Sequence, residues 1–121
     1  MYNLLIVDDD VHFLASLERV LGSDFVVKKV SDGDAARKAL MDEPDLVLLD
    51  IRLNEEDSGN QEGVELLKQF VQGRPGMPII MMSAYGDVDT AVECMQVGAT
   101  DFIKKPFNIN AYQTAMFFMH H

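Results

Sequence analysis

Three aspartates follow two apolar runs that lie far apart in the sequence. Asp8 and Asp9 come directly after residues 4–7, and Asp50 comes directly after residues 46–49. If these runs are neighbouring parallel strands, the carboxylates meet at one edge of a sheet, where two of them about 4 Å apart repel by about 4 kcal/mol at an effective dielectric constant of about 20. A cation must offset this repulsion, and carboxylate oxygens favour Mg²⁺, with Mn²⁺ as an alternative. The spacing therefore predicts an open divalent-metal site.

The same cluster has the groups that phosphoryl transfer requires. A carboxylate such as Asp50 can accept a phosphoryl group as a covalent acyl phosphate. The charge on the transferred group needs counter-charges and donors, which a metal ion, a lysine and the hydroxyl of Ser83 would supply. Ser83 follows the apolar run at 79–82, and Lys105 follows a weaker strand candidate at 101–104. The pattern predicts Asp50 as the nucleophile, with Ser83 and a lysine that leaves the strand at 101–104 beside it.

Five predicted strands that alternate with five predicted helices would position these residues. Runs that are apolar at every position are typical of parallel strands covered on both faces. The alternation favours a doubly wound α/β sandwich with right-handed crossovers, whose ligands bind beyond the carboxyl ends of the strands. The strands are expected at 4–7, 25–30, 46–49, 79–82 and 101–104. The helices are expected around the apolar sets Leu14, Leu17, Leu21; Ala35, Ala36, Ala39, Leu40; Val64, Leu67, Val71; Val88, Ala91, Val92, Met95; and Ile109, Tyr112, Met116, Met119.

Composition limits the class of protein. The 121 residues, 48% apolar and 25% charged, fit one globular domain. Cys94 is the single cysteine, which excludes an internal disulfide and favours a reducing compartment, so we expect a cytoplasmic protein. Cys94 lies off the apolar stripe expected for its helix and is interpreted as an inert thiol. No apolar run is long enough for a membrane span, and the start does not have the pattern of a signal peptide. The net charge of −10 disfavours direct binding of nucleic acid.

Four motifs give the sequence a resemblance to the receiver domains of two-component response regulators, along nearly its whole length. They are LLIVDDD, LVLLDIRL, MMSAYGDVDTAVECMQVGATDFIKKPF and the pair Lys105-Pro106. The resemblance implies a flavodoxin-like fold with a five-stranded parallel sheet of order 2-1-3-4-5 and five helices, as a single domain over residues 1–121. It implies a phosphoacceptor signalling domain, and not an enzyme, that takes a phosphoryl group on Asp50 from a sensor histidine kinase or a phosphotransfer protein with Mg²⁺.

The resemblance also implies roles for the residues around Asp50. Asp9 and Asp50 would ligate Mg²⁺, Asp8 would act largely through water, and the backbone carbonyl of Arg52 would complete the protein ligands. Lys105, and not its neighbour at 104, matches the lysine that binds the phosphoryl group.

A switch is implied at Ser83 and Phe102. Ser83 would turn toward the new phosphoryl oxygens, and Phe102 would pack into the space that Ser83 vacates. The face made by the fourth and fifth helices would shift as a result, and this face is the expected surface of a homodimer. Arg52 and Tyr85 flank the site and are expected to set the lifetime of the aspartyl phosphate.

One stretch suggests a subfamily and another departs from the family pattern. Residues 83–107 are similar to receivers of alternative-sigma-factor-dependent transcription activators, so we expect a role in transcription regulation through output domains absent from this chain. Asn54 replaces a usual proline, and residues 55–62 lengthen the loop before Gly63. The last helix is apolar on all sides at 116–119. His120 and His121 are either a tag remnant or a native tail, and no function is predicted for them.

Two other functions match part of the pattern. A phosphohydrolase of the haloacid-dehalogenase type would use Asp8 as nucleophile with Asp10, but His12 replaces the usual Thr or Val. A calcium-binding module resembling an EF-hand would lie at 54–65, but its first position is not Asp and its two flanking helices are not predicted. For Asp9 and Asp10 there is also a purely structural interpretation, as the N-cap of the following helix.

Overall fold

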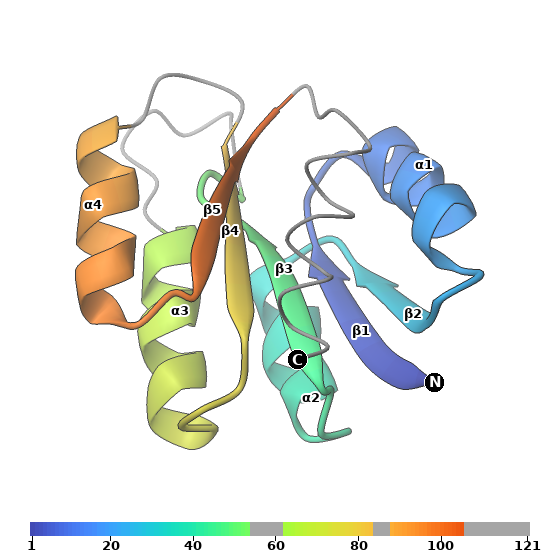
Figure 1. Cartoon of the computed structure of the whole chain (residues 1–121), viewed down its shortest axis with the longest axis horizontal. Helices are drawn as coiled ribbons and strands as arrows, with labels where there is room; N and C mark the ends of the chain where they lie inside the picture. The colour runs from blue at the N-terminus through green and yellow to red at the C-terminus, as the bar shows by residue number, and fades with distance from the viewer. Residues whose placement is uncertain (54–61, 84–87, 106–121) are drawn as a thin grey trace.

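The computed structural model describes residues 1–53, 62–83 and 88–105, in which five strands alternate with four helices (Figure 1). The elements are β1 Tyr2–Val7, α1 Val11–Leu21, β2 Phe25–Val30, α2 Gly33–Leu40, β3 Leu46–Asp50, α3 Glu62–Gly73, β4 Ile79–Ser83, α4 Val88–Val97 and β5 Asp101–Lys104. The fifth helix, expected around residues 109–119, lies outside the described residues.

The strands form one parallel sheet of order β2-β1-β3-β4-β5, which confirms the predicted fold class and strand order. β1 lies beside β3, with Leu4 opposite Leu46 and Val7 opposite Leu49. The next residue on each chain is therefore an aspartate, at the carboxyl edge of the sheet where ligands of such folds bind. This register brings residues about forty positions apart to the same level.

Helices cover both faces of the sheet, so β3 and β4 are buried at every position. Figure 1 shows α1 on one face and α2, α3 and α4 on the other. Within β3, Leu46 and Leu48 pack with α1, whereas Val47 and Leu49 pack with α2, α3 and α4. Because successive side chains of a strand point to opposite faces, a strand between two helical layers must be apolar throughout. This burial explains the uninterrupted apolar runs.

Aspartates at the strand ends start the first two helices. The carboxylate of Asp10 accepts hydrogen bonds from the backbone N–H groups of His12 at 3.0 Å and Phe13 at 3.1 Å. Asp32 does the same for Ala35 at 2.7 Å. These bonds satisfy N–H groups that have no partner within a first helical turn. The structural interpretation of Asp10 is therefore confirmed, and its carboxylate belongs to the start of α1.

The buried stripe of α4 differs from the predicted one. Val92 and Met95 are 52% and 44% exposed, while Cys94 is fully buried in the core beside α3. The prediction was wrong because most positions of α4 are apolar, so a second stripe through Cys94 and Val97 has the same helical spacing. Burial, with the negative charge of Glu93, raises the pKa of the Cys94 thiol to about 11, which keeps it in the unreactive protonated form.

Over the described residues, none of the helices has the length and apolar character needed to cross a lipid bilayer. The longest of them, α3, has 12 residues.

Candidate functional site

The three aspartates predicted to converge do meet at the carboxyl edge of the sheet. One carboxylate oxygen from each of Asp8, Asp9 and Asp50 lies within 4.8 Å of the others. Asp8 and Asp50 are almost fully buried, whereas Asp9 is exposed. The cluster is therefore open to solvent on one side only, as a site for an exchangeable ligand must be.

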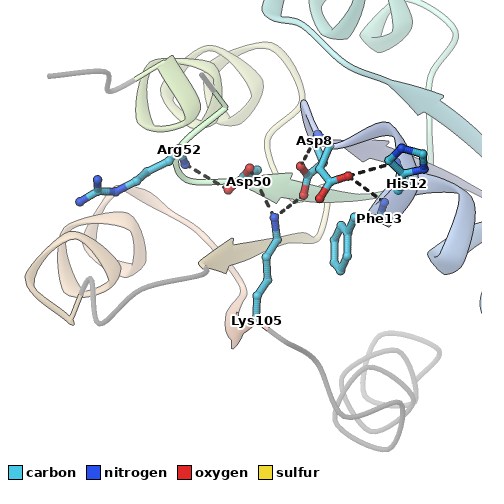
Figure 2. A network of polar contacts seen from close by, with 7 residues as sticks. Asp8, His12, Phe13, Asp50, Arg52 and Lys105 are labelled. Atoms are coloured by element: carbon cyan, nitrogen blue, oxygen red, sulfur yellow. Dashed lines mark hydrogen bonds and ion pairs between the residues drawn. The ribbon is translucent and has the colours of Figure 1, made fainter. Parts of the chain in front are cut away.

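Lys105 supplies a positive charge to this cluster from the residue after β5 (Figure 2). Its ammonium pairs with Oδ2 of Asp8 and lies 3.5 Å from Oδ2 of Asp50. Lys104 is exposed, because the side chains of successive residues alternate along a strand. Lys105 is thus the lysine that reaches the carboxylates.

Backbone N–H groups orient the two buried carboxylates. Oδ1 of Asp8 accepts a hydrogen bond from the N–H of Asp10 at 3.0 Å, and Oδ1 of Asp50 accepts one from the N–H of Arg52 at 3.1 Å. In both cases Oδ2 is the oxygen that faces Lys105. The loop after each strand therefore fixes one oxygen and leaves the other for chemistry.

Burial dominates the electrostatics of Asp50. Desolvation, together with the negative charge of Asp8 and a weaker effect of Asp9, raises the pKa of Asp50 from 3.8 to about 7. The charge of Lys105 and the hydrogen bond from Arg52 act in the opposite direction. Burial also lowers the pKa of Lys105, but the carboxylates of Asp50 and Asp8 more than offset this, so its net shift is upward. Lys105 is thus a cation, and full ionisation of Asp50 requires further positive charge.

The cluster fits a divalent cation. Its donors are all carboxylate oxygens, the ligand type that Mg²⁺ and Mn²⁺ prefer. Three ionised carboxylates beside one lysine leave two uncompensated negative charges, which one such cation neutralises. Burial, and after it the charge of Asp8, raises the pKa of Asp50, and a cation bound at the cluster would oppose both effects.

The other residues singled out in the sequence lie at the same edge or outside the described part. Ser83 ends β4 and is 1% exposed, next to the end of β3 because Met82 pairs with Asp50. Phe102 is half-buried on β5 and packs against the core on the side of α4. The guanidinium of Arg52 points away from Asp50 (Figure 2). Tyr85, Pro106 and residues 54–61 lie outside the described residues.

Gly63 shows why the loop after Asp50 must end in glycine. A Cβ atom at this position would lie 2.2 Å from the carbonyl oxygen of Asp50 and 2.3 Å from that of Ile51. The first turn of α3 therefore passes directly against the end of β3. Gly63 was noticed in the sequence only as the end of the lengthened loop.

Sequence reasoning missed Phe13, whose ring centroid lies 4.4 Å from the ammonium of Lys105. A single aromatic residue in the first turn of a helix gives no local sign of such a contact, because its partner is 92 positions away. Only the packing of α1 in the same core cluster as Ile103 of β5 brings the two together.

The two alternative functions lose support. The carboxylate of Asp10, which a phosphohydrolase would need, caps α1, and that of Asp8 is paired with Lys105. An EF-hand at 54–65 would need a helix before it, but β3 occupies that position. Most of that segment lies outside the described residues, and its last four positions belong to α3.

Comparison with known proteins gives a consistent result. Residues 4–117 match the family described as "Response regulator receiver domain". The chain is 35% identical over 116 residues to "Transcriptional regulatory protein ZraR" of Klebsiella oxytoca, covering 94% of this chain and 25% of that protein. It is 39% identical over 107 residues to "DNA-binding transcriptional regulator NtrC" of Escherichia coli (strain K12), covering 87% and 22%. The chain thus spans about a quarter of the length of these curated relatives.

Solved structures agree in fold. The receiver domain of NtrX from Brucella abortus superposes with a TM-score of 0.86 at 32% identity, and 97% of each chain is covered. A response regulator receiver domain protein (CheY-like) from Methanospirillum hungatei JF-1 gives a TM-score of 0.86 at 29% identity, covering 97% of this chain and 91% of that one.

Proposed function

Since this chain belongs to the family of response regulator receiver domains, we propose that residues 1–121 form one receiver domain that accepts a phosphoryl group on Asp50. The donor is a phosphohistidine on a sensor histidine kinase or a phosphotransfer protein. The observation that carries the proposal is the buried carboxylate of Asp50 in one cluster with Asp8, Asp9 and Lys105. A receiver domain is not a conventional enzyme, and the chemistry that it assists is the gain and loss of its own phosphoryl group.

The two oxygens of Asp50 differ in a way that assigns the attacking atom. Oδ1 accepts the hydrogen bond from Arg52, whereas Oδ2 faces Lys105 at 3.5 Å. Oδ2 is therefore the nucleophile. As its bond to phosphorus forms, the bond from phosphorus to the imidazole nitrogen of the donor breaks, and the imidazole keeps the electron pair.

Lys105 stabilises the negative charge of the phosphoryl group during this step. Its ammonium has three N–H donors, so it can exchange its contact with Asp8 for an oxygen of the incoming phosphoryl group. Asp9, Asp50 and the backbone carbonyl of Arg52, with Asp8 largely through water, would hold Mg²⁺ or Mn²⁺, which when bound supplies positive charge to the same phosphoryl oxygens.

Ser83 and Phe102 form the proposed switch. Ser83 is buried at the end of β4, beside the strand that carries Asp50, and Phe102 lies on the next strand, opposite Met81. In the phosphorylated state the Ser83 hydroxyl turns to a phosphoryl oxygen, and Phe102 packs into the space released. The face of α4 and the predicted fifth helix then changes and becomes the surface of a homodimer. Val92 and Met95, both exposed on α4, provide apolar area for this contact.

The switch is tested by Ser83→Ala. Phosphorylation of Asp50 should continue at a similar rate, while the phosphorylation-dependent change in α4 and in dimer mass should be reduced. The measurements are phosphorylation by mass spectrometry, amide chemical shifts in α4, and light scattering. A variant that dimerises as well as the wild type on phosphorylation would remove Ser83 from the switch.

The lifetime of the phosphorylated state is assigned to Arg52 and Tyr85. The support is the position of Arg52, two residues after Asp50, where its backbone N–H donates to Oδ1 of Asp50 and its side chain is exposed. Exchange of both residues to Ala should change the half-life of the aspartyl phosphate. An unchanged half-life would exclude both residues from this role.

The output of the domain is proposed to be transcription regulation in the cytoplasm. The relatives named above are regulators of transcription, and this chain corresponds to about a quarter of their length. The net charge of −10 makes this chain itself unsuited to contact nucleic acid, so DNA binding would belong to other domains. The single cysteine, buried and without a disulfide partner, suits a reducing compartment.

The central experiment follows phosphorylation by a small phosphodonor such as acetyl phosphate with Mg²⁺. The label should appear on Asp50 and should be absent in Asp50→Asn, while Asp24→Asn, an exposed aspartate outside the cluster, serves as control. A label on Asp8 would instead favour the phosphohydrolase, and a lack of any label would overturn the proposed function.

A further inference from the structure

The ring of Phe13 lies beside the ammonium of Lys105, on the side away from Asp50 (Figure 2). The distance from Nζ to the ring centroid is 4.4 Å, within the range of a cation–π contact. The side chain of Lys105 is only 10% exposed, so the contact is shielded from water. Shielding strengthens such a contact, because water no longer competes for the cation.

Phe13 and Lys105 belong to a closed circuit of contacts around Asp8. Oδ1 of Asp8 accepts the N–H of Asp10 at 3.0 Å, and the carboxylate of Asp10 accepts the N–H of Phe13 at 3.1 Å. The ring of Phe13 contacts Lys105, and the ammonium of Lys105 donates a hydrogen bond to Oδ2 of Asp8. The start of α1, the end of β1 and the end of β5 are thereby held in one arrangement.

The lysine needs a partner of this kind. Its four-carbon chain is flexible, and holding it in one position costs rotamer entropy. Its two carboxylate partners do not give a permanent position, because the proposed mechanism moves the ammonium from Asp8 to the phosphoryl group. An aromatic face attracts the cation without taking up one of its three N–H donors in a strong hydrogen bond, so it can hold the lysine before and after that exchange.

We propose that Phe13 is a positioning residue that holds the ammonium of Lys105 in place for phosphoryl transfer to Asp50. This inference rests on the proposed function, because it assumes that Lys105 stabilises the transferred group. Phe13 does not contact the reacting atoms and acts only through Lys105.

The kinetic test compares variants of Phe13 in phosphorylation by acetyl phosphate with Mg²⁺. Phe13→Leu keeps an apolar side chain of similar size and removes the aromatic face, and the phosphorylation rate constant should fall about fivefold to thirtyfold. Phe13→Tyr restores the face and should recover most of the rate. Val20→Ala trims another half-buried residue of α1 that packs on the same core cluster without a contact to Lys105, and is the matched control.

A double-mutant cycle with Lys105→Met separates positioning from general packing. In the Lys105→Met background the change Phe13→Leu should have little further effect, since the cation is gone. Equal losses in both backgrounds, or an unchanged rate in Phe13→Leu, would overturn the inference. Wild-type protein that takes no label on Asp50 would instead show that the proposed function fails.

A spectroscopic readout needs neither metal nor phosphoryl group and does not depend on how well a Phe13 variant folds. In the wild type, the Hε protons of Lys105 should resonate upfield of those of the other five lysines, because the ring current of Phe13 shields them. The Lys105→Met variant assigns the signal. An unshifted Lys105 signal in the folded wild-type protein would contradict the contact on which the inference depends.

Discussion

Charged side chains meet in two very different settings in this domain. At the carboxyl edge of the sheet, Lys105 lies between Asp8 and Asp50, and all three side chains are 10% exposed or less. At the edge strand β2, Lys28 pairs with Asp42 and Lys29 with Glu18, each at 3.0 Å, but these side chains are 36% to 67% exposed. Similar lysine–carboxylate pairs occur in both settings. The difference between the settings is therefore the burial of the side chains.

The difference in burial explains a difference in function. Water screens the pairs at β2, so they add little stability and their loss would leave well-solvated ions. At the site, Asp8, Asp50 and Lys105 are largely shielded from water, so their charges depend on one another, and a phosphoryl group or a cation can change the balance. The raised pKa of Asp50 is the direct sign of this dependence.

The largest effect is expected from Lys105→Met without metal. The change leaves Asp8 and Asp50 buried without their cation, and removing one partner of a buried ion pair costs about 3 to 5 kcal/mol of unfolding free energy. Part of this loss is relieved by protonation of the carboxylates. Urea denaturation at neutral pH measures it, with Lys28→Met as the matched exposed control. Equal losses of unfolding free energy in the two variants would show that burial does not distinguish the two settings.

The next effect concerns pH. The pKa of Asp50 is about 7 in the folded protein and near 3.8 when unfolded, so its contribution to stability is fully present at low pH and is lost as the pH rises through 7. Asp50→Asn lacks this titration. Without metal, the variant should therefore gain about 2 to 4 kcal/mol of unfolding free energy relative to the wild type between pH 4 and pH 8. If the unfolding free energies of the two proteins changed with pH in the same way, ionisation of Asp50 would not destabilise the folded state.

Mg²⁺ should stabilise the folded domain by a smaller amount. At a concentration ten times its dissociation constant, a ligand that binds only the folded state adds about 1.4 kcal/mol. The melting temperature should rise with Mg²⁺ in the wild type and much less in Asp9→Asn, which removes the exposed carboxylate of the cluster. An equal rise in both proteins would place the metal elsewhere.

The smallest effect is expected at the exposed pairs of β2. Lys29→Met, like Lys28→Met, should change the unfolding free energy by about 0 to 1 kcal/mol, and by less at 1 M salt. Urea denaturation at two salt concentrations measures this. A salt-independent loss of several kcal/mol would mean that exposure does not separate the two settings as argued above.

The strands and the aspartates that follow them were predictable because their signals are local. A strand covered on both faces must be apolar at every position, as at Leu46 to Leu49, and the polar residue that follows marks its end. The adjacency of the first and third strands, which unites Asp8 with Asp50, was implied by resemblance to a family and not by any local pattern. The described structure confirms this adjacency.

The orientation of α4 was not predictable, because no local pattern decides which of its faces is buried. Its sequence has two apolar stripes with the same helical spacing, and only contact with α3 selects the one through Cys94. Gly98, at the end of α4, lies against Val71. A Cβ at this position would be 3.2 Å from each of the two methyl carbons of Val71. The positive φ of 134° also favours glycine here. In this orientation Cys94 is buried, while Val92 and Met95 are exposed.

The sequence alone determined which segments become strands and helices and which residue types stand at the strand ends, because hydrophobic period and helix capping depend on near neighbours. The tertiary structure decided how far Asp50 is shielded from water, which oxygens of Asp8 and Asp50 face Lys105, and that Phe13 lies beside that lysine. These properties depend on distances between atoms that are 42 to 97 positions apart in the chain, and such distances are set only when the layers pack.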